Sequence, residues 1–375
     1  MKTYIAFLFS FFILIGCTHN NSITNECLNL SVNYHDAITA IDTQLVDLAS
    51  IQYIPLKGHK GVVGDISKLI VSKGFYLLLD KQQKCIWQFD TVGTFLNLIS
   101  REGKGPEEYR EIDRIAYDFN EHVYVTGYDN PQKKVYDFSG NYLNTELLKY
   151  CPLDIAYIDS ILYTINYYIP ENSDSNDKFY LHIYDEKTNV SSKFFSYKES
   201  LHEGFQDNLF SICNKDIFLN MPLNDTIYQI INGNEIKQAY YFDFGSEKFP
   251  NAELMQLASL PERDELLGEK AFQGKICDLN ISKTHLTFSY SYKVNNYSKV
   301  AFVIYNRNNG NLINYKSLKF QGLYSDLPHP IATDGDFFYS ILFPYQITKD
   351  GTKILKSMGK DISENICMLK YKYKI

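Results

Sequence analysis

The sequence of 375 residues predicts an all-β fold, a six-bladed β-propeller closed by an N-terminal strand. The first observation behind this prediction is a repeat. Residues 66–147 hold two copies of one pattern, whose ends Phe89-Asp90 and Tyr136-Asp137 lie 136 − 89 = 47 residues apart. Strand-like self-similarity at a period of roughly 45 is typical of propeller blades. The second observation is composition, because 31 Tyr and 25 Phe against one Trp favour half-buried pleated sheets.

Each of the first two blades is predicted to contain four short strands separated by turns. Two of these turns are Asp-x-x-Gly sequences that end at Gly93 and Gly140. Asp bonds nearby backbone amides, and Gly adopts positive φ without steric cost. The predicted strands are 66–71, 75–79, 84–89 and 95–99 in blade one, and 112–117, 122–127, 133–138 and 142–147 in blade two.

The later blades are less regular, but an aromatic residue near the end of each third strand still marks them. The six markers are Phe89, Tyr136, Tyr184, Tyr228, Tyr305 and Tyr371. Small helical insertions are predicted near 261–272, where Pro261 favours a helix start, and near 351–360.

Ring closure follows from an uneven strand count. The last blade lacks a fourth strand, and the otherwise unassigned strand 51–56 is predicted to supply it by pairing with residues 366–373. Such pairing would remove an exposed sheet edge. A β-sandwich or a non-closed repeat is the alternative.

The start of the chain predicts export and anchoring. Residues 1–16 carry Lys2 and then an apolar run too short to span a bilayer, which is typical of a signal peptide. Leu14-Ile15-Gly16-Cys17 resembles a bacterial lipobox, which implies lipidation of Cys17 and a membrane-anchored protein of the cell envelope. An ordinary signal peptide with a chance cysteine is the alternative.

Residues 17–45 are predicted to be the lipidated cysteine and a flexible tether, and 46–375 the propeller. Deleting residues 18–45 is therefore expected to be nearly silent, whereas deleting 18–57 is expected to destabilise the ring. Residues 18–22 have no acidic run of the kind that resembles a surface-export signal, so a periplasm-facing protein is expected.

Composition restricts the partners and the redox state. The formal charge is 37 − 44 = −7, with both signs well mixed, which argues against nucleic acid as a partner. Seven Cys less Cys17 leave six. Their wide spacing inside apolar runs favours free thiols, although an exported protein also permits disulfides.

Several motifs together carry a family likeness. After the lipobox come Tyr53-Ile54-Pro55-Leu56, the loop Gly103-Lys104-Gly105-Pro106-Glu107-Glu108-Tyr109, and the blade end Tyr136-Asp137-x-x-Gly140. This order resembles the six-bladed β-propeller lipoproteins of Bacteroides-type bacteria, which are related to NHL-repeat propellers. The loop in that family usually reads Gly-x-Gly-Pro-Gly-Glu-Tyr, so Glu107 departs from the pattern. The resemblance implies fold and location but no common activity.

The loop 101–111 is the best candidate ligand site, because it joins two blades and loops on a rigid scaffold often carry function. Arg101, Lys104, Tyr109 and Arg110 are its candidate residues, and they would bind an anionic group such as a sugar acid or phosphate. The alternative is structural: Gly-Pro shapes the crossover, Tyr109 packs between blades, and neighbouring glutamates pair the charges.

His59, His202 and His329 fall in connections expected on the same face as that loop. They would serve as ligand-binding, acid–base or metal-binding residues if they converged, and are otherwise three unrelated surface histidines. No hydrolase, zinc-protease or EF-hand motif is present, so no catalytic residue, metal or cofactor is predicted.

The expected function is ligand binding or protein interaction, with a glycan, a peptide or another envelope protein as partner. A hydrolase or lyase acting on an extracytoplasmic ester or glycan at the propeller mouth is the alternative.

Overall fold

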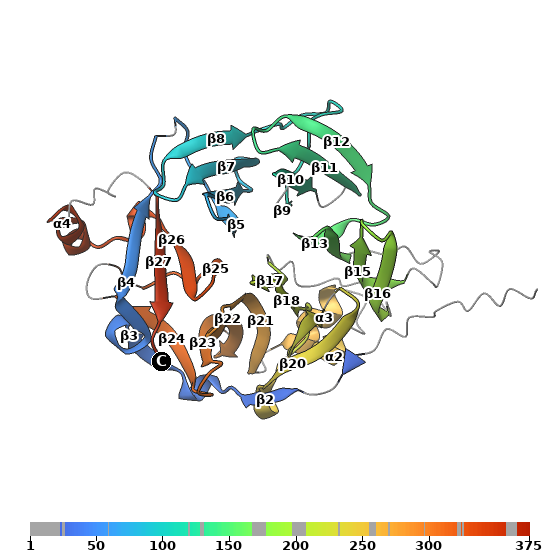
Figure 1. Ribbon diagram of the computed structural model, residues 1–375. Helices are drawn as coiled ribbons and strands as arrows, with labels where there is room; N and C mark the ends of the chain where they lie inside the picture. Colours follow the sequence, from blue (N-terminus) through green and yellow to red (C-terminus); the bar gives the residue numbers. More distant parts are fainter. Residues whose placement is uncertain are drawn as a thin grey trace, which may run out of the picture.

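The computed structural model describes residues 23–24, 27–58, 60–118, 121–127, 131–166, 178–196, 208–231, 233–254, 260–268, 271–295, 297–320, 324, 326–357 and 366–375. In these ranges the chain forms six β-sheets. Figure 1 shows them standing around a common centre as the blades of a propeller, with β5, β9, β13, β17, β21 and β25 innermost.

The first three sheets are four-stranded and antiparallel, with their strands in chain order. The predicted strands of blades one and two are confirmed, with ends shifted by at most two residues. The strands are β5 (Ile66–Val71), β6 (Phe75–Asp80), β7 (Cys85–Asp90), β8 (Phe95–Ile99), β9 (Arg114–Tyr117), β10 (His122–Thr126), β11 (Gln132–Asp137), β12 (Tyr142–Leu147), β13 (Pro152–Ile158), β14 (Ile161–Asn166), β15 (Phe179–Asp185) and β16 (Val190–Ser196).

The last three sheets follow the same plan, and all six predicted marker aromatics lie in third strands. Their own strands are β17 (Phe210–Cys213), β18 (Asp216–Asn220), β19 (Thr226–Ile231), β20 (Glu235–Asp243), β21 (Phe272–Ile281), β22 (His285–Val294), β23 (Tyr297–Asn306), β24 (Leu312–Lys319), β25 (Ala332–Asp334), β26 (Phe337–Leu342) and β27 (Cys367–Tyr373).

Helices occur at both predicted insertions. The first holds α2 (Asn251–Leu254) and α3 (Leu260–Leu267), and the second holds α4 (Lys349–Ser357). The predicted range 261–272 ran too far, because Phe272 already begins the inner strand β21 and is buried.

The predicted closing strand is present and longer than expected. β4 (Val46–Pro55) pairs antiparallel with β27, with Tyr53 opposite Leu369. This pairing supplies the fourth strand of the sixth sheet and joins a strand from the N-terminal part of the chain to the C-terminal strand in one blade (Figure 1).

The prediction of a flexible tether over 17–45 is wrong for residues 23–24 and from residue 28 onward. β2 (Leu28–Ser31) pairs in parallel with β20, and β3 (Ile38–Ile41) pairs in parallel with β24. The short β1 (Ile23–Thr24) also pairs with β20, while η1 (Tyr34–Asp36) and α1 (Asp42–Leu45) connect the strands. The physical reason is that the outer edges of β20 and β24 offer unpaired backbone groups, which an added strand satisfies.

The hydrophobic core lies between neighbouring blades. One cluster joins Trp87 of blade one to Tyr339 and Met368 of blade six, and another joins Leu77 of blade one to Val123 of blade two. The six cysteines of the described residues form no disulfide; Cys85, Cys213 and Cys367 are buried, and Cys27, Cys151 and Cys277 are half-buried.

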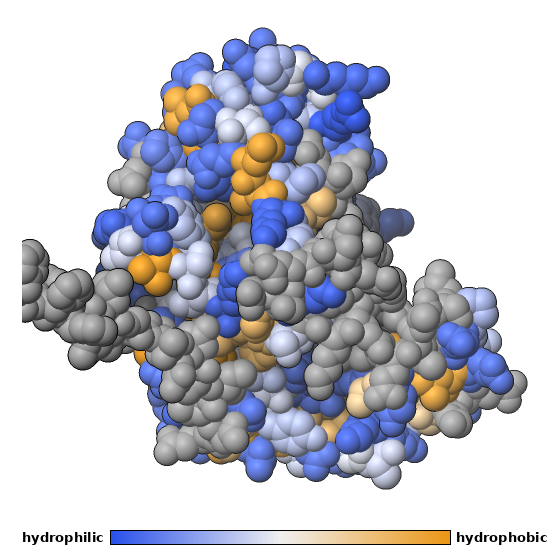
Figure 2. Space-filling view, turned by 90° about the vertical axis from the view of Figure 1, so that its right-hand side faces the viewer, coloured by the Kyte–Doolittle hydropathy of each residue, from blue (hydrophilic) through white to orange (hydrophobic). Residues whose placement is uncertain are grey.

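The face of the molecule drawn in Figure 2 is mainly hydrophilic where it is coloured. On the side that Figure 2 shows, the coloured hydrophobic residues are scattered among hydrophilic ones. Among the described residues, no helix is long and apolar enough to cross a membrane.

Candidate functional site

The predicted site loop joins β8 to β9 and folds back on itself. The Gly103 N–H donates to the Tyr109 carbonyl at 3.0 Å, and the Tyr109 N–H donates to the Arg101 carbonyl at 3.0 Å. A Cβ on Gly103 would lie 1.8 Å from the Glu108 carboxylate, so this close turn requires glycine. The same carboxylate accepts the Gly105 N–H at 2.8 Å. Hydrogen bonds within the loop, from its backbone and from Glu108, therefore define the conformation of this connection between blades.

Tyr109 and Arg101 fasten this loop to the blades. The Tyr109 hydroxyl donates to the carbonyl of Lys84 at 2.9 Å and accepts the Arg101 N–H at 3.1 Å. Its side chain is buried, and burial raises the pKa of Tyr109 to about 12. The Arg101 guanidinium donates to the Gly140 carbonyl of blade two at 3.2 Å. Tyr109 therefore packs between blades one and two, and Arg101 bonds a backbone carbonyl of blade two.

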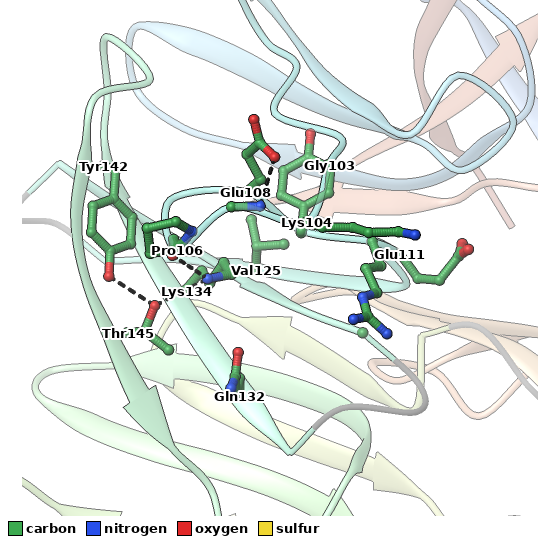
Figure 3. A pocket seen from close by; sticks show the side chains of 14 residues that line it. Gly103, Lys104, Pro106, Glu108, Glu111, Val125, Gln132, Lys134, Tyr142 and Thr145 are labelled. Carbon is green, nitrogen blue, oxygen red and sulfur yellow. Dashed lines mark hydrogen bonds between the residues drawn. The ribbon is translucent and has the colours of Figure 1, made fainter.

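A cavity of about 600 Å³ lies beside the loop, between it and blade two. Lys104 and Arg110 line it from the loop, Gln132 and Lys134 from β11, and Tyr142 and Thr145 from β12 (Figure 3). Three of the four predicted loop residues, Lys104, Tyr109 and Arg110, thus line one cavity, whereas Arg101 is not among its lining residues.

Some charged side chains around this cavity have bonding partners in the protein and others do not. Glu108 accepts a backbone N–H, and Glu111 pairs with Lys84 at 3.1 Å. Lys134 donates to the Pro106 carbonyl at 2.7 Å and to Thr145 at 3.2 Å. By contrast, no hydrogen bond or ion pair joins the Lys104 ammonium or the Arg110 guanidinium to the described part of the chain. Among the described residues that line the cavity, three cations and two carboxylates leave 3 − 2 = +1, and both carboxylates are already bonded.

The predicted histidines do not join this cavity. His329 precedes β25, stacks on Phe302 at 5.2 Å between ring centroids, and its Nε2 lies 3.0 Å from the Asp278 carbonyl. Burial lowers the pKa of His329. His59 and His202 lie outside the described residues, and so does the predicted lipidation site Cys17.

A polar cluster between blades two and three was not predicted. His122 Nδ1 lies 3.1 Å from an Asp118 oxygen that also accepts the Tyr124 hydroxyl at 2.8 Å. These residues line a cavity of about 340 Å³ together with Glu146 and Glu186, whose carboxylates lie 2.9 and 3.7 Å from the buried Lys133. A buried aspartate that orients a half-exposed histidine is an arrangement used for proton transfer.

Sequence reasoning also missed the strand residues of the first cavity. Gln132 and Lys134 look like ordinary alternating polar positions of a third strand. The repeat itself was a usable signal. Its spacing of 47 residues aligns Lys134 of blade two with Trp87 of blade one, 134 − 87 = 47. A lysine where blade one has a buried tryptophan marks a departure from simple packing.

Fold and cavities together define a β-propeller with a polar cavity at the crossover between its first two blades. The chain belongs to a family described as a domain of unknown function (DUF4934), which matches residues 36–366. This span begins inside the predicted tether, in agreement with the strand pairings of residues 28–41. No curated protein matches the chain.

Two crystal structures share the fold. A protein of Bacteroides fragilis NCTC 9343 that is described as exported has 17% identity and a TM-score of 0.73, covering 92% of this chain and 100% of its own. A DUF4221 family member of Bacteroides vulgatus ATCC 8482 has 11% identity and a TM-score of 0.52, covering 88% and 98%. The predicted likeness to proteins of Bacteroides is confirmed, whereas lipidation and the NHL relationship stay predictions.

Proposed function

We propose that this protein is an extracytoplasmic binding module and that the cavity beside the 101–111 loop binds an anionic group, such as a sugar acid or a phosphate. The observation that carries the proposal is the pair of unengaged cations, Lys104 and Arg110, in a cavity whose carboxylates are already bonded. An anion would gain charge-assisted hydrogen bonds there without displacing an existing partner. A glycan bearing a uronic acid, an acidic peptide or an acidic envelope protein offers such a group.

The test compares glucuronate, inorganic phosphate and glucose by calorimetric titration. We expect an anion to bind and glucose to bind at least about tenfold more weakly, because one charge-assisted hydrogen bond contributes about 1.5–3 kcal/mol. Lys104→Ala with Arg110→Ala should abolish this preference. If the double variant binds the anion as tightly as the unchanged protein does, the loop is not part of the binding site.

Lys353→Ala is a matched control, because Lys353 is an exposed lysine on α4 that pairs with Asp350, three residues away. It should leave all three titrations unchanged.

We also propose that Cys17 is lipidated and holds the module at the membrane, facing the periplasm. The lipobox-like sequence and the relative described as exported support this. Cys17→Ser should move the protein from the membrane fraction to the soluble fraction or block its processing. Normal processing and membrane retention of the variant would refute the anchor.

The Asp118–His122 pair favours a second candidate, a hydrolase or lyase acting on an extracytoplasmic ester or glycan. Hydrolysis of p-nitrophenyl acetate tests it. An enzyme should lose about 100-fold or more of this activity in His122→Ala. An equal rate in His122→Ala and in His182→Ala, which changes a histidine that does not line this cavity, would exclude His122 as the base.

A further inference from the structure

A second cavity, of about 480 Å³, lies at the centre of the propeller, and residues from all six inner sheet edges line it. On β9 its lining residue is Tyr117, the last of the strand, whereas the 101–111 loop enters β9 at its first residue. The central cavity therefore opens on the face opposite the loop. Lys73, Asp159 and Lys215, which follow their inner strands, form part of its rim.

Polar bonds between inner strands of different blades close the deeper end of this cavity. Asn208 donates to the Ser67 carbonyl at 3.0 Å, and Asn280 donates to the Pro330 carbonyl at 2.7 Å. Lys68 donates to the Ile155 carbonyl at 3.3 Å and to Asp154 at 2.9 Å. The cavity is thus a cup with a polar floor, and we call it the central cup.

Asp154 is the buried half of the charge pair in this floor. One oxygen accepts Lys68 and the Ile155 N–H at 2.9 Å, and the other accepts the N–H groups of Leu209 at 2.8 Å and Phe210 at 3.2 Å. Burial alone would raise the pKa of Asp154, but the charges of Lys68 and Arg114 outweigh it and lower that pKa. The carboxylate has no exposed surface and its two oxygens are fully engaged.

Lys68 is the half of the pair that faces the cup. Its side chain is 14% exposed and lines the cavity, whereas that of Asp154 is 0% exposed. An ammonium group has three N–H donors, and two of them are used by Asp154 and Ile155. No third acceptor for Lys68 is present among the described residues. The floor therefore presents positive charge and one available donor to the cup.

The walls above this floor are mainly apolar. Leu69, Val71, Ile158, Ile212 and Ile331 contribute to them, and Ile212 is 39% exposed although it is a large apolar residue. The rim has no net charge, because Lys73 and Lys215 are balanced by Asp159 and Asp334, 2 − 2 = 0, and Lys215 pairs with Asp159 at 2.6 Å. Selection by charge is thus concentrated at the floor.

We propose that the central cup binds a small amphipathic carboxylate, with its apolar body along the walls and its carboxylate on Lys68. Apolar walls with one placed charge are the usual construction of a small-molecule site of this size. The carboxylate would use the available N–H of Lys68 without breaking the pair with Asp154. This site is independent of the cavity beside the 101–111 loop and lies on the other face.

Calorimetric titration of the purified protein with octanoate, octanol and octylammonium tests this proposal, because the three probes share one chain length and differ in charge. Octanoate should bind at least about tenfold more tightly than octanol, the effect of one charge-assisted hydrogen bond. Octylammonium should bind most weakly. Equal affinities for octanoate and octanol, or no binding of octanoate, would overturn the proposal.

Two variants locate the binding. Ile212→Trp should fill the cup and abolish binding of octanoate and octanol alike, whereas Leu147→Trp, at an 80% exposed position of β12, should leave both unchanged. Octanoate binding that survives Ile212→Trp would refute the location.

Lys68→Met with Asp154→Asn removes both charges together and so avoids an unpaired buried carboxylate. It should keep octanol affinity and lose the preference for octanoate. A preference that persists in the folded double variant would refute the role of Lys68. Should the double variant not fold, the three probes and Ile212→Trp on their own still decide the proposal.

Discussion

Blades one to three and blades four to six complete their sheets in different ways. Each of the first three takes four consecutive strands from one stretch of chain. The last three each accept a strand from residues 28–55: β2 joins β20, β3 joins β24, and β4 joins β27. The N-terminal segment therefore follows the outer edges of half the ring (Figure 1).

Strand pairing is therefore local in sequence in one half of the propeller, whereas the other half also needs pairing between distant residues. A blade made from consecutive strands can form as soon as its own chain is present. The outer pairing of blades four to six needs residues more than 200 positions apart, as in Leu28 opposite Tyr240, 240 − 28 = 212. Loop closure over such distances costs conformational entropy that only the completed ring offsets.

Removing the N-terminal strands should have the largest effect on stability, because blades four to six depend on them. Deleting residues 18–57 removes β2, β3 and β4, and leaves three outer edges unpaired. We expect loss of cooperative unfolding and aggregation, because exposed edges invite intermolecular pairing. Thermal melts followed by circular dichroism, with sedimentation velocity, measure this.

The shorter deletion 18–45 keeps β4 and separates the two roles. The strand pairings now predict a clear loss of stability rather than the near-silent result expected of a tether. Hydrogen exchange should show weakened protection in β20 and β24 and unchanged protection in β8 and β12. Equal stability of this variant and the complete chain would show that β2 and β3 contribute nothing.

The charge pair in the floor of the central cup links the two halves of the ring. Lys68 of blade one bonds Asp154 of blade three. Asp154 also accepts two N–H groups at the start of β17 in blade four. Asp154→Ala should cost about 3–5 kcal/mol, since it leaves a buried lysine unpaired. Lys215→Ala should cost no more than about 1 kcal/mol, because its pair with Asp159 is exposed. Urea denaturation measures both.

The same pair predicts a pH dependence. The pKa of Asp154 in the folded protein is lower than its ordinary value of 3.8, so its contribution is complete well above that value. It is lost as the pH falls through the folded pKa. The stability difference between the protein and Asp154→Asn should therefore be constant near neutrality and shrink only below about pH 4. A difference that shrinks between pH 6 and 8 would contradict the assignment.

Two turn glycines at equivalent positions of blades one and two form a matched pair. Gly93 has φ +85° and Gly140 has φ +84°, so alanine meets the same backbone strain in both, roughly 1–2 kcal/mol. A Cβ on Gly93 would lie 2.2 Å from the Pro55 carbonyl of β4, whereas one on Gly140 would lie 3.2 Å from the Ile99 side chain. Gly93→Ala should therefore be the more destabilising in chemical denaturation. Equal losses would mean that β4 moves away freely.

The smallest effect belongs to the crossover loop. Arg101→Ala removes a hydrogen bond to the Gly140 carbonyl and should cost about 1 kcal/mol. Lys104→Ala should stay within about 0.5 kcal/mol, because this side chain bonds to none of the described residues. The reverse order in denaturation would show that Lys104, not Arg101, fastens blade one to blade two.

The sequence by itself determined the elements whose signals are local. Strand alternation, the glycines of the Asp-x-x-Gly turns and the third-strand aromatics predicted the sheets, since period and turn chemistry act over a few residues. Strand counting added the pairing of Tyr53 with Leu369, which β4 and β27 make. Lys104 and Arg110 were also found, because both lie in one short loop.

Only the tertiary structure decided the contacts that depend on ring closure. Residues 28–34 alternate between apolar and polar, but no local pattern in 28–41 names a partner strand; the open edges of β20 and β24 decide the pairing. Lys68 and Asp154 are separate charged residues until the ring brings their strands together across 86 positions of sequence. The central cup therefore could not be read from local patterns, since its floor and walls exist only when six distant strands share one axis.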